Sequence, residues 1–171
     1  GSWCYNWYGN TANYNGVIFE TPDNISSNTS SVTLYHTTHS NFNTKIINIS
    51  GKTKEYFMLE NIGHDGYQAG LDYMIGGNDN TSGIAIWHID ENQSGNSDYT
   101  HKLVDLEEAA DAGLDLGAHN GKQTSLFFSG NKTEFSNSTN PNSKTYSGTS
   151  SGITINNISA AGDSMTFDVS F

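Results

Sequence analysis

The sequence contains no arginine, only one cysteine and only two prolines. Its seven long basic side chains are all lysines, and 18 Asp and Glu residues outnumber them, so the net charge is −11. A partner with a phosphate backbone requires a cationic surface, so nucleic acid is disfavoured as a ligand. The single cysteine, Cys4, excludes both an internal disulfide framework and a zinc cage built from thiolates, since each needs several cysteines.

Long hydrophobic runs are also missing. No apolar run approaches the roughly 20 residues that a membrane helix requires, so we expect no membrane span.

The 171 residues are enough for one domain with a sizeable core, because a domain of about 150 residues buries roughly 70% of its unfolded surface. Gly1-Ser2 has the appearance of a cloning remnant. We therefore expect residues 3–171 to form a single domain that was excised from a larger protein.

Short apolar clusters separated by Asn, Ser, Thr and Gly are typical of short strands joined by polar turns. Alternating apolar and polar residues over 151–158 and 164–171 predict strands with one wet face. Residues 55–59 and 84–89 are apolar on both faces, so we expect these strands to be central, or covered by another domain whose removal would expose an apolar patch. The predicted strands are 16–20, 31–37, 44–50, 54–61, 83–90, 102–107, 124–128, 151–158 and 164–171.

Nine strands and almost no helix predict an all-β fold, specifically an antiparallel β-sandwich that is jelly-roll-like. Only the segment DLEEAADAGLDLG has helical spacing. In a helix, Leu106, Ala109 and Ala110 would share one side, and Gly113 would mark the end. We therefore expect at most one short helix, near 105–112.

Motifs for catalysis are weak or absent. The helical His-Glu-x-x-His motif of zinc hydrolases does not occur in the sequence. His36 and His39 are three positions apart, which on a strand sends them to opposite faces, so they are expected to be ordinary strand histidines. Ser150 lies in a G-x-S-x-G pattern, but that nucleophile elbow needs a following helix, and the next residues are strand-like. The sequence therefore shows no coherent constellation for an enzyme acting in its own right.

An oxygen-rich turn follows the apolar strand 83–90. His88 and Asp90 share one face of that strand where it leaves the core. Oxygen-bearing side chains then follow at the spacing of the first three-quarters of an EF-hand-type calcium loop: Asp90, Asn92, Ser94 and Asp98. The twelfth position is His101, so an acid from elsewhere, Glu107 or Glu108, would complete the site. These residues predict a structural calcium site; a plain turn is the alternative, because the same residue types favour tight turns.

The N-terminal segment WCYNWYG is rich in aromatic residues. Large aromatic side chains usually pack over a core, but they can also form a platform that stacks on sugar rings. The second interpretation makes a carbohydrate- or cell-surface-binding module the alternative function. It rests on four residues: Trp3, Trp7, Tyr8 and Tyr14.

Four segments, taken in order, resemble one protein family: EYFMLENIG (55–63), GIAIWHIDEN (83–92), HKLVDLEEAADAG (101–113) and residues 131–169. They resemble the region downstream of the catalytic domain in immune inhibitor A-type secreted bacterial zinc metallopeptidases. The segment WCYNWYG is similar to the Trp-containing segment that follows the catalytic helices there. The resemblance spans nearly the whole chain, and Trp-His-Ile-Asp and Val-Asp-Leu-Glu-Glu are its most specific parts. Ile62 stands where the family usually has an arginine.

The zinc-binding helix of that family lies upstream of this region, so the resemblance implies that the chain holds no zinc and is not itself an enzyme. It implies a noncatalytic accessory β-sandwich domain of a secreted, extracellular bacterial protease, stabilised by calcium and packed against the catalytic domain of its parent chain. Such a domain would stabilise the protease or position its substrate, in contact with a protein or glycan surface. Trp87 and Ile89 would pack internally, and the acids of 90–115 would hold loops.

Overall fold

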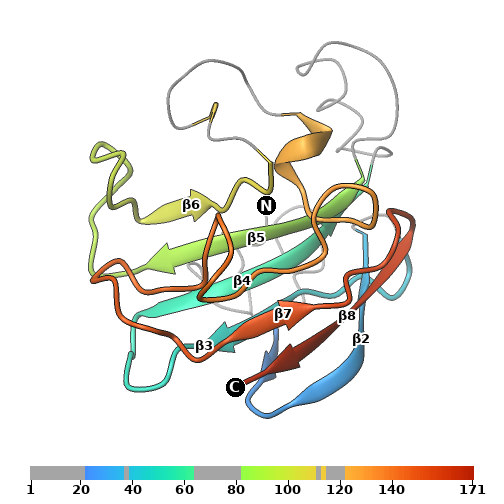
Figure 1. The fold of residues 1–171 in the computed structure, drawn as a ribbon, viewed down its shortest axis with the longest axis horizontal. Helices are drawn as coiled ribbons and strands as arrows, with labels where there is room; N and C mark the ends of the chain where they lie inside the picture. Colours follow the sequence, from blue (N-terminus) through green and yellow to red (C-terminus); the bar gives the residue numbers. More distant parts are fainter. Residues whose placement is uncertain (1–21, 37–38, 64–81, 111–112, 115–121) are drawn as a thin grey trace, which may run out of the picture.

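Two β-sheets packed face to face form the described part of the protein (Figure 1). The computed structural model describes residues 22–36, 39–63, 82–110, 113–114 and 122–171. The prediction of an all-β, sandwich-like fold is confirmed. The elements are β1 (Asp23–Ile25), β2 (Thr29–Tyr35), β3 (Lys45–Asn48), β4 (Glu55–Ile62), β5 (Gly83–Asp90), β6 (Val104–Leu106), the 3-10 turn η2 (Gln123–Ser125), β7 (Thr154–Asn156) and β8 (Ser164–Ser170).

The larger sheet has the strand order β1-β3-β4-β5-β6, and the smaller sheet has the order β2-β8-β7. β4 and β5 pair along their whole length, from Glu55 opposite Asp90 to Ile62 opposite Gly83. Each has a strand on both sides, which confirms that the strands that are apolar on both faces are central. The prediction of purely antiparallel sheets is wrong at one edge, where β1 pairs with β3 in parallel. The reason is that β2, which lies between them in sequence, belongs to the other sheet, so the chain returns in the same direction.

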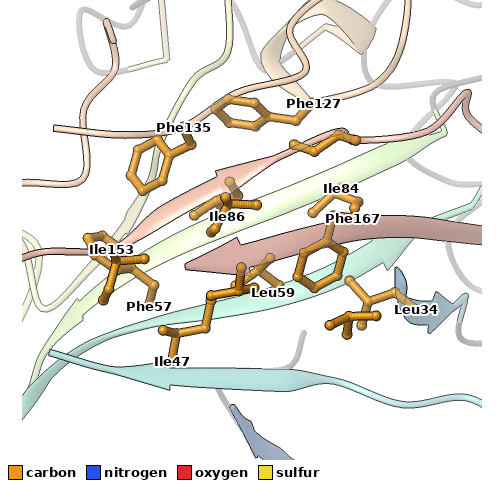
Figure 2. Close-up of a cluster of buried hydrophobic side chains, with 14 of the residues drawn as sticks. Leu34, Ile47, Phe57, Leu59, Ile84, Ile86, Phe127, Phe135, Ile153 and Phe167 are labelled. Atoms are coloured by element: carbon orange, nitrogen blue, oxygen red, sulfur yellow. The ribbon is translucent and has the colours of Figure 1, made fainter. Parts of the chain in front are cut away.

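The core lies between the sheets and is filled by large apolar side chains (Figure 2). β4 contributes Phe57 and Leu59, and β5 contributes Ile84 and Ile86; all four are fully buried. The smaller sheet contributes every second residue of β8, while the residues between them are exposed or half-buried. This alternation follows from strand geometry, because successive side chains point to opposite faces.

The outer face of the larger sheet is apolar as well. Tyr56, Met58 and Ile89 lie on it and are buried, and Trp87 packs against them. Ile89 is therefore internal, as the sequence predicts, whereas Trp87 is half-buried. Among the described residues, the exposed large hydrophobic side chains are Tyr99 and Phe171. This part of the surface therefore lacks the apolar patch that removal of a neighbouring domain would expose.

The helical spacing near 105–112 does not produce a helix in the part of that segment which the structure describes. Residues Val104–Leu106 instead form β6, where Leu106 lies opposite Trp87 and Asp105 opposite His88. A short isolated helix is marginal in water, whereas an added edge strand gains ladder hydrogen bonds and packing at once. No helix among the described residues has the length and apolar character needed to cross a membrane.

The predicted strand at 124–128 is also wrong. Its first residues belong to η2, and only Phe127 pairs with a strand, through two backbone hydrogen bonds of 2.9 Å with Ile84. Gly83 permits this close approach, because a Cβ atom there would lie 2.7 Å from the Cβ of Leu126. The predicted strand at 16–20 lies outside the described residues.

Candidate functional site

One end of the core-facing side of the larger sheet is polar. The strand register places Glu55 opposite Asp90, and Phe57 opposite His88. The alternation that buries Ile86 in the core also puts His88 and Asp90 on the same face, as the sequence predicts. These polar residues meet others from two loops, and together they are called the polar cluster: Glu55, His88, Asp90, His101, Glu107 and Tyr146.

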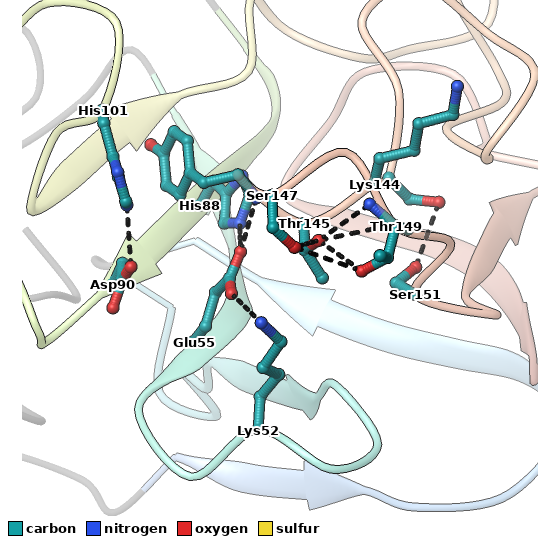
Figure 3. Close-up of polar contacts among 12 residues, drawn as sticks. Lys52, Glu55, His88, Asp90, His101, Lys144, Thr145, Ser147, Thr149 and Ser151 are labelled. Carbon is teal, nitrogen blue, oxygen red and sulfur yellow. Dashed lines mark hydrogen bonds and ion pairs between the residues drawn. The ribbon is translucent and has the colours of Figure 1, made fainter.

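His88 is the centre of the polar cluster (Figure 3). Its side chain is 3% exposed, and its ring lies against Phe57 with the centroids 4.6 Å apart. Nε2 lies 3.1 Å from Oε1 of Glu55, and Nδ1 lies 3.1 Å from Oε1 of Glu107. Each ring nitrogen therefore faces a carboxylate oxygen at hydrogen-bond distance, and the buried imidazole ring is held between two acidic side chains.

The carboxylate of Glu55 contacts three other residues. Besides the contact with His88, its Oε1 accepts the backbone N–H of Tyr146 at 2.7 Å. Its Oε2 lies 3.2 Å from Nζ of Lys52, which belongs to the turn before β4 (Figure 3). Buried charges are tolerated when they are paired and hydrogen-bonded in this way. Glu55 thus joins β4, β5 and the 140s loop at a single carboxylate.

Tyr146 inserts its ring between two imidazoles. The ring centroids lie 4.2 Å from His88, with an interplanar angle of 13°, and 4.1 Å from His101, with an angle of 30°. Its hydroxyl group is buried and has no hydrogen-bond partner among the described residues. Burial, reinforced by the nearby carboxylates of Asp105, Glu107 and Asp90, raises the pKa of this phenol above its ordinary value of 10.0. Tyr146 therefore stays neutral and serves as a packing group.

The carboxylates of the predicted calcium loop close its turns. Oδ1 of Asp90 accepts hydrogen bonds from the backbone and the side-chain amide of Asn92, at 2.9 and 2.8 Å, while Oδ2 lies 2.8 Å from Nε2 of His101. Oδ1 of Asp98 accepts the backbone N–H of Thr100 at 2.9 Å and its hydroxyl at 2.7 Å. Ser94 is exposed. These contacts are those of Asx turns, which the sequence analysis left as the alternative.

The two acids proposed to complete the calcium site have other partners. Glu107 binds His88, and both carboxylate oxygens of Glu108 lie within 3.2 Å of the backbone nitrogen of Leu114. The described residues contain no group of three or more His, Cys, Asp or Glu side chains placed to hold a metal ion. The structure brings Asp90 and Asn92 together and leaves Glu107 and Glu108 in separate contacts. Calcium binding stays a prediction.

The lowered pKa of Asp90 predicts how the stability of the protein changes in acid. Burial alone would raise its pKa, but the hydrogen bonds from Asn92 and His101 outweigh burial and hold the pKa below its ordinary value of 3.8. Because the folded pKa is depressed, this stabilisation is present above the unfolded value and is lost as the pH falls through the folded value. We expect Asp90→Asn to lower Tm at neutral pH and the difference from wild type to narrow below about pH 4. A Tm difference that does not change with pH would contradict this prediction.

A cavity of about 480 Å³ lies beside the polar cluster, with His88 and Tyr146 among its lining residues. Its lining also includes three acids, Asp105, Glu107 and Glu108, and two lysines, Lys132 and Lys144. Its carboxylates already have partners: Asp105, for example, pairs with Lys102 at 2.6 Å. The carboxylates that border the cavity are therefore already paired or hydrogen-bonded.

His36 and His39 follow β2 rather than lying in a strand, and their rings meet edge-on with the centroids 6.3 Å apart, so the prediction that they point to opposite faces of a strand is wrong. Nε2 of His36 lies 3.5 Å from Oδ1 of Asp163, while His39 stacks on Tyr35 with the ring centroids 4.4 Å apart. The four aromatic residues considered for sugar binding lie outside the described residues: Trp3, Trp7, Tyr8 and Tyr14.

Glu55 and Tyr146 are not among the predicted site residues. Glu55 begins a strand next to a lysine-rich turn, where a solvated acid is the ordinary expectation. Its position on the His88 face follows only from the β4–β5 register. Tyr146 lies 91 residues further along the chain from Glu55, in a loop of turn-forming residues, and no periodicity marks it.

No family model, curated protein or solved structure matches this chain.

Proposed function

We propose that this chain is a noncatalytic accessory β-sandwich domain of a secreted bacterial zinc metallopeptidase, which stabilises the protease or positions its substrate. One observation carries the proposal: each of the four segments that resemble the family contributes a side chain to the polar cluster. The contributing residues, in segment order, are Glu55, His88, Glu107 and Tyr146. Segments that resemble a family because they build one structural unit are expected to meet in this way.

The geometry of the polar cluster favours a structural role over catalysis. A general base must reach the proton that it abstracts, at hydrogen-bond distance or through one water. His88 is buried and both of its ring nitrogens contact carboxylates, while Glu55 is buried and bound by Lys52, His88 and Tyr146. These contacts use the hydrogen-bonding groups that a catalytic pair would offer to a substrate. The cluster instead fixes a loop to the sheet.

Three experiments test the proposal. The reading frame that encodes the parent protein should contain a His-Glu-x-x-His helix upstream of this domain, and a frame without one would overturn the proposal. The purified chain should cleave no protein substrate, with zinc or without it. Zinc-dependent proteolysis that disappears in a His88→Ala variant would assign catalysis to this domain instead. In the parent protease, deletion of the domain should lower Tm or the yield of active enzyme.

Calcium belongs to the same proposal as a structural ion of the Asp90–Asp98 turn. The unfolding midpoint in millimolar calcium should exceed that in excess EDTA, since a ligand at 100 times its Kd adds about 2.7 kcal/mol, which is several degrees at this size. Equal midpoints would mean that the turn binds no calcium and is held by its own hydrogen bonds.

A further inference from the structure

At one edge of each sheet lies a strand whose outer side pairs with no other described strand: β6 in the larger sheet and β2 in the smaller one (Figure 1). Such an edge presents a row of backbone N–H and C=O groups that can template pairing with another chain. In both strands, outward-directed backbone groups are bound by the side-chain amide of an asparagine from a nearby turn. These asparagines are Asn96 beside β6 and Asn43 beside β2.

Asn96 imitates an antiparallel neighbour of β6. Its Nδ2 donates to the carbonyl oxygen of Val104 at 2.8 Å, and its Oδ1 accepts the N–H of the same residue at 3.0 Å. In an antiparallel ladder, two opposed residues exchange both hydrogen bonds in this way. The amide therefore occupies the donor and the acceptor that an incoming antiparallel strand would use.

Asn43 imitates a parallel neighbour of β2. Its Oδ1 accepts the N–H of Tyr35 at 2.9 Å, and its Nδ2 donates to the carbonyl oxygen of Thr33 at 3.0 Å. In a parallel ladder, one residue bonds the N–H and C=O of two residues that are two positions apart, so the amide matches that spacing. Thr33 lies opposite Thr166, whose own backbone carbonyl accepts from Ser159, so Thr33 directs its groups away from β8.

We propose that Asn43 and Asn96 are edge guards that prevent β2 and β6 from pairing with a second copy of this chain. A primary amide carries a donor and an acceptor at the spacing of a peptide group, so one side chain can saturate one position of an edge. Charged residues, lysine above all, are the common alternative device. This chain has no arginine and few lysines, and β2 contains no charged residue at all. β2 also carries a bulge between Thr29 and Val32, a second device that disfavours edge pairing.

The test uses the double variant Asn43→Ala/Asn96→Ala of the full chain. Sedimentation equilibrium should show a weight-average mass that rises above the monomer mass with concentration, while wild type stays monomeric. The matched control is Asn48→Ala, because Asn48 donates to the side chain of Asn24 rather than to an edge backbone group. The control should stay monomeric.

Hydrogen exchange locates the association. The amide protons of Tyr35 and Val104 should exchange faster in the dilute double variant and become protected again as it associates. Association without protection at either amide would place the contact elsewhere and overturn the proposal. A double variant that is monomeric at every concentration would also overturn it. If the double variant does not fold, the single variants Asn43→Ala and Asn96→Ala, measured separately, give the same readout at one edge each.

Discussion

Replacement of Glu55 by alanine is expected to lower the free energy of unfolding by about 3–5 kcal/mol, the usual cost of removing one partner from a buried ion pair. The variant leaves the buried ring of His88 with one carboxylate instead of two, and it leaves the N–H of Tyr146 without its acceptor. Lys52 loses its partner as well. For a chain of this length, the midpoint of thermal unfolding should fall by roughly 10 °C.

Two controls separate the lost carboxylate from the lost side chain. Glu55→Gln keeps an acceptor oxygen for the N–H of Tyr146 but removes the charge opposite His88, so its Tm should lie between those of wild type and Glu55→Ala. Glu134→Ala removes an exposed acid and should change Tm by very little, as most surface substitutions do. Equal losses for Glu55→Ala and Glu134→Ala would show that the polar cluster contributes nothing to stability.

The value of such a cluster lies in which parts of the chain it joins. A buried ion pair often contributes little net stability compared with a well-packed apolar substitute, because both charges must be desolvated. The His88 contacts nevertheless require β4, β5 and the segment after β6 to adopt one relative position, and the stacked ring of Tyr146 adds the 140s loop. An apolar end of the core would tolerate several packings, whereas paired nitrogens and carboxylates tolerate few. Under the proposed function, this would fix the surface that the domain presents to its partner.

The strands could be predicted where the apolar pattern was continuous. β5 has the predicted bounds, 83–90, and its central position with β4 follows from apolar residues on both faces. β1 was missed, because the three residues Asp23–Ile25 show no strand pattern and are held by parallel pairing with β3. No pattern in the local sequence indicates that β1 pairs with β3.

Part of the polar cluster could be predicted from local sequence, and part of it could not. Strand alternation places His88 and Asp90 on one face without any knowledge of the fold. The partners of His88, by contrast, depend on register and on a loop far along the chain. The oxygen spacing from Asp90 to Asp98 could not decide between an ion and a turn, because the residue types that ligate calcium are also those that close turns.

Phe135→Ala should destabilise the protein by about 3–5 kcal/mol, the usual cost of truncating a buried Phe to Ala. Phe135 is fully buried and meets Phe57 and Phe127 edge-on, with centroid distances of 5.2 and 5.8 Å. Its backbone exchanges hydrogen bonds of 2.8 and 2.9 Å with Ile155, so it anchors the start of the segment that carries Tyr146. The truncation should therefore also speed hydrogen exchange at the N–H of Tyr146.

Chemical denaturation of Phe135→Ala, Phe135→Leu and Phe128→Ala compares their free energies of unfolding. Phe135→Leu keeps most of the volume and should lose less than about 1.5 kcal/mol, as volume-conserving swaps usually do. Phe128→Ala removes the neighbouring ring, which is only partly buried against the same core, so it should cost less than Phe135→Ala. Equal losses at 128 and 135 would mean that burial between the sheets is not what holds this segment. Unchanged exchange at Tyr146 in Phe135→Ala would mean that the polar cluster holds the 140s loop without help from the core.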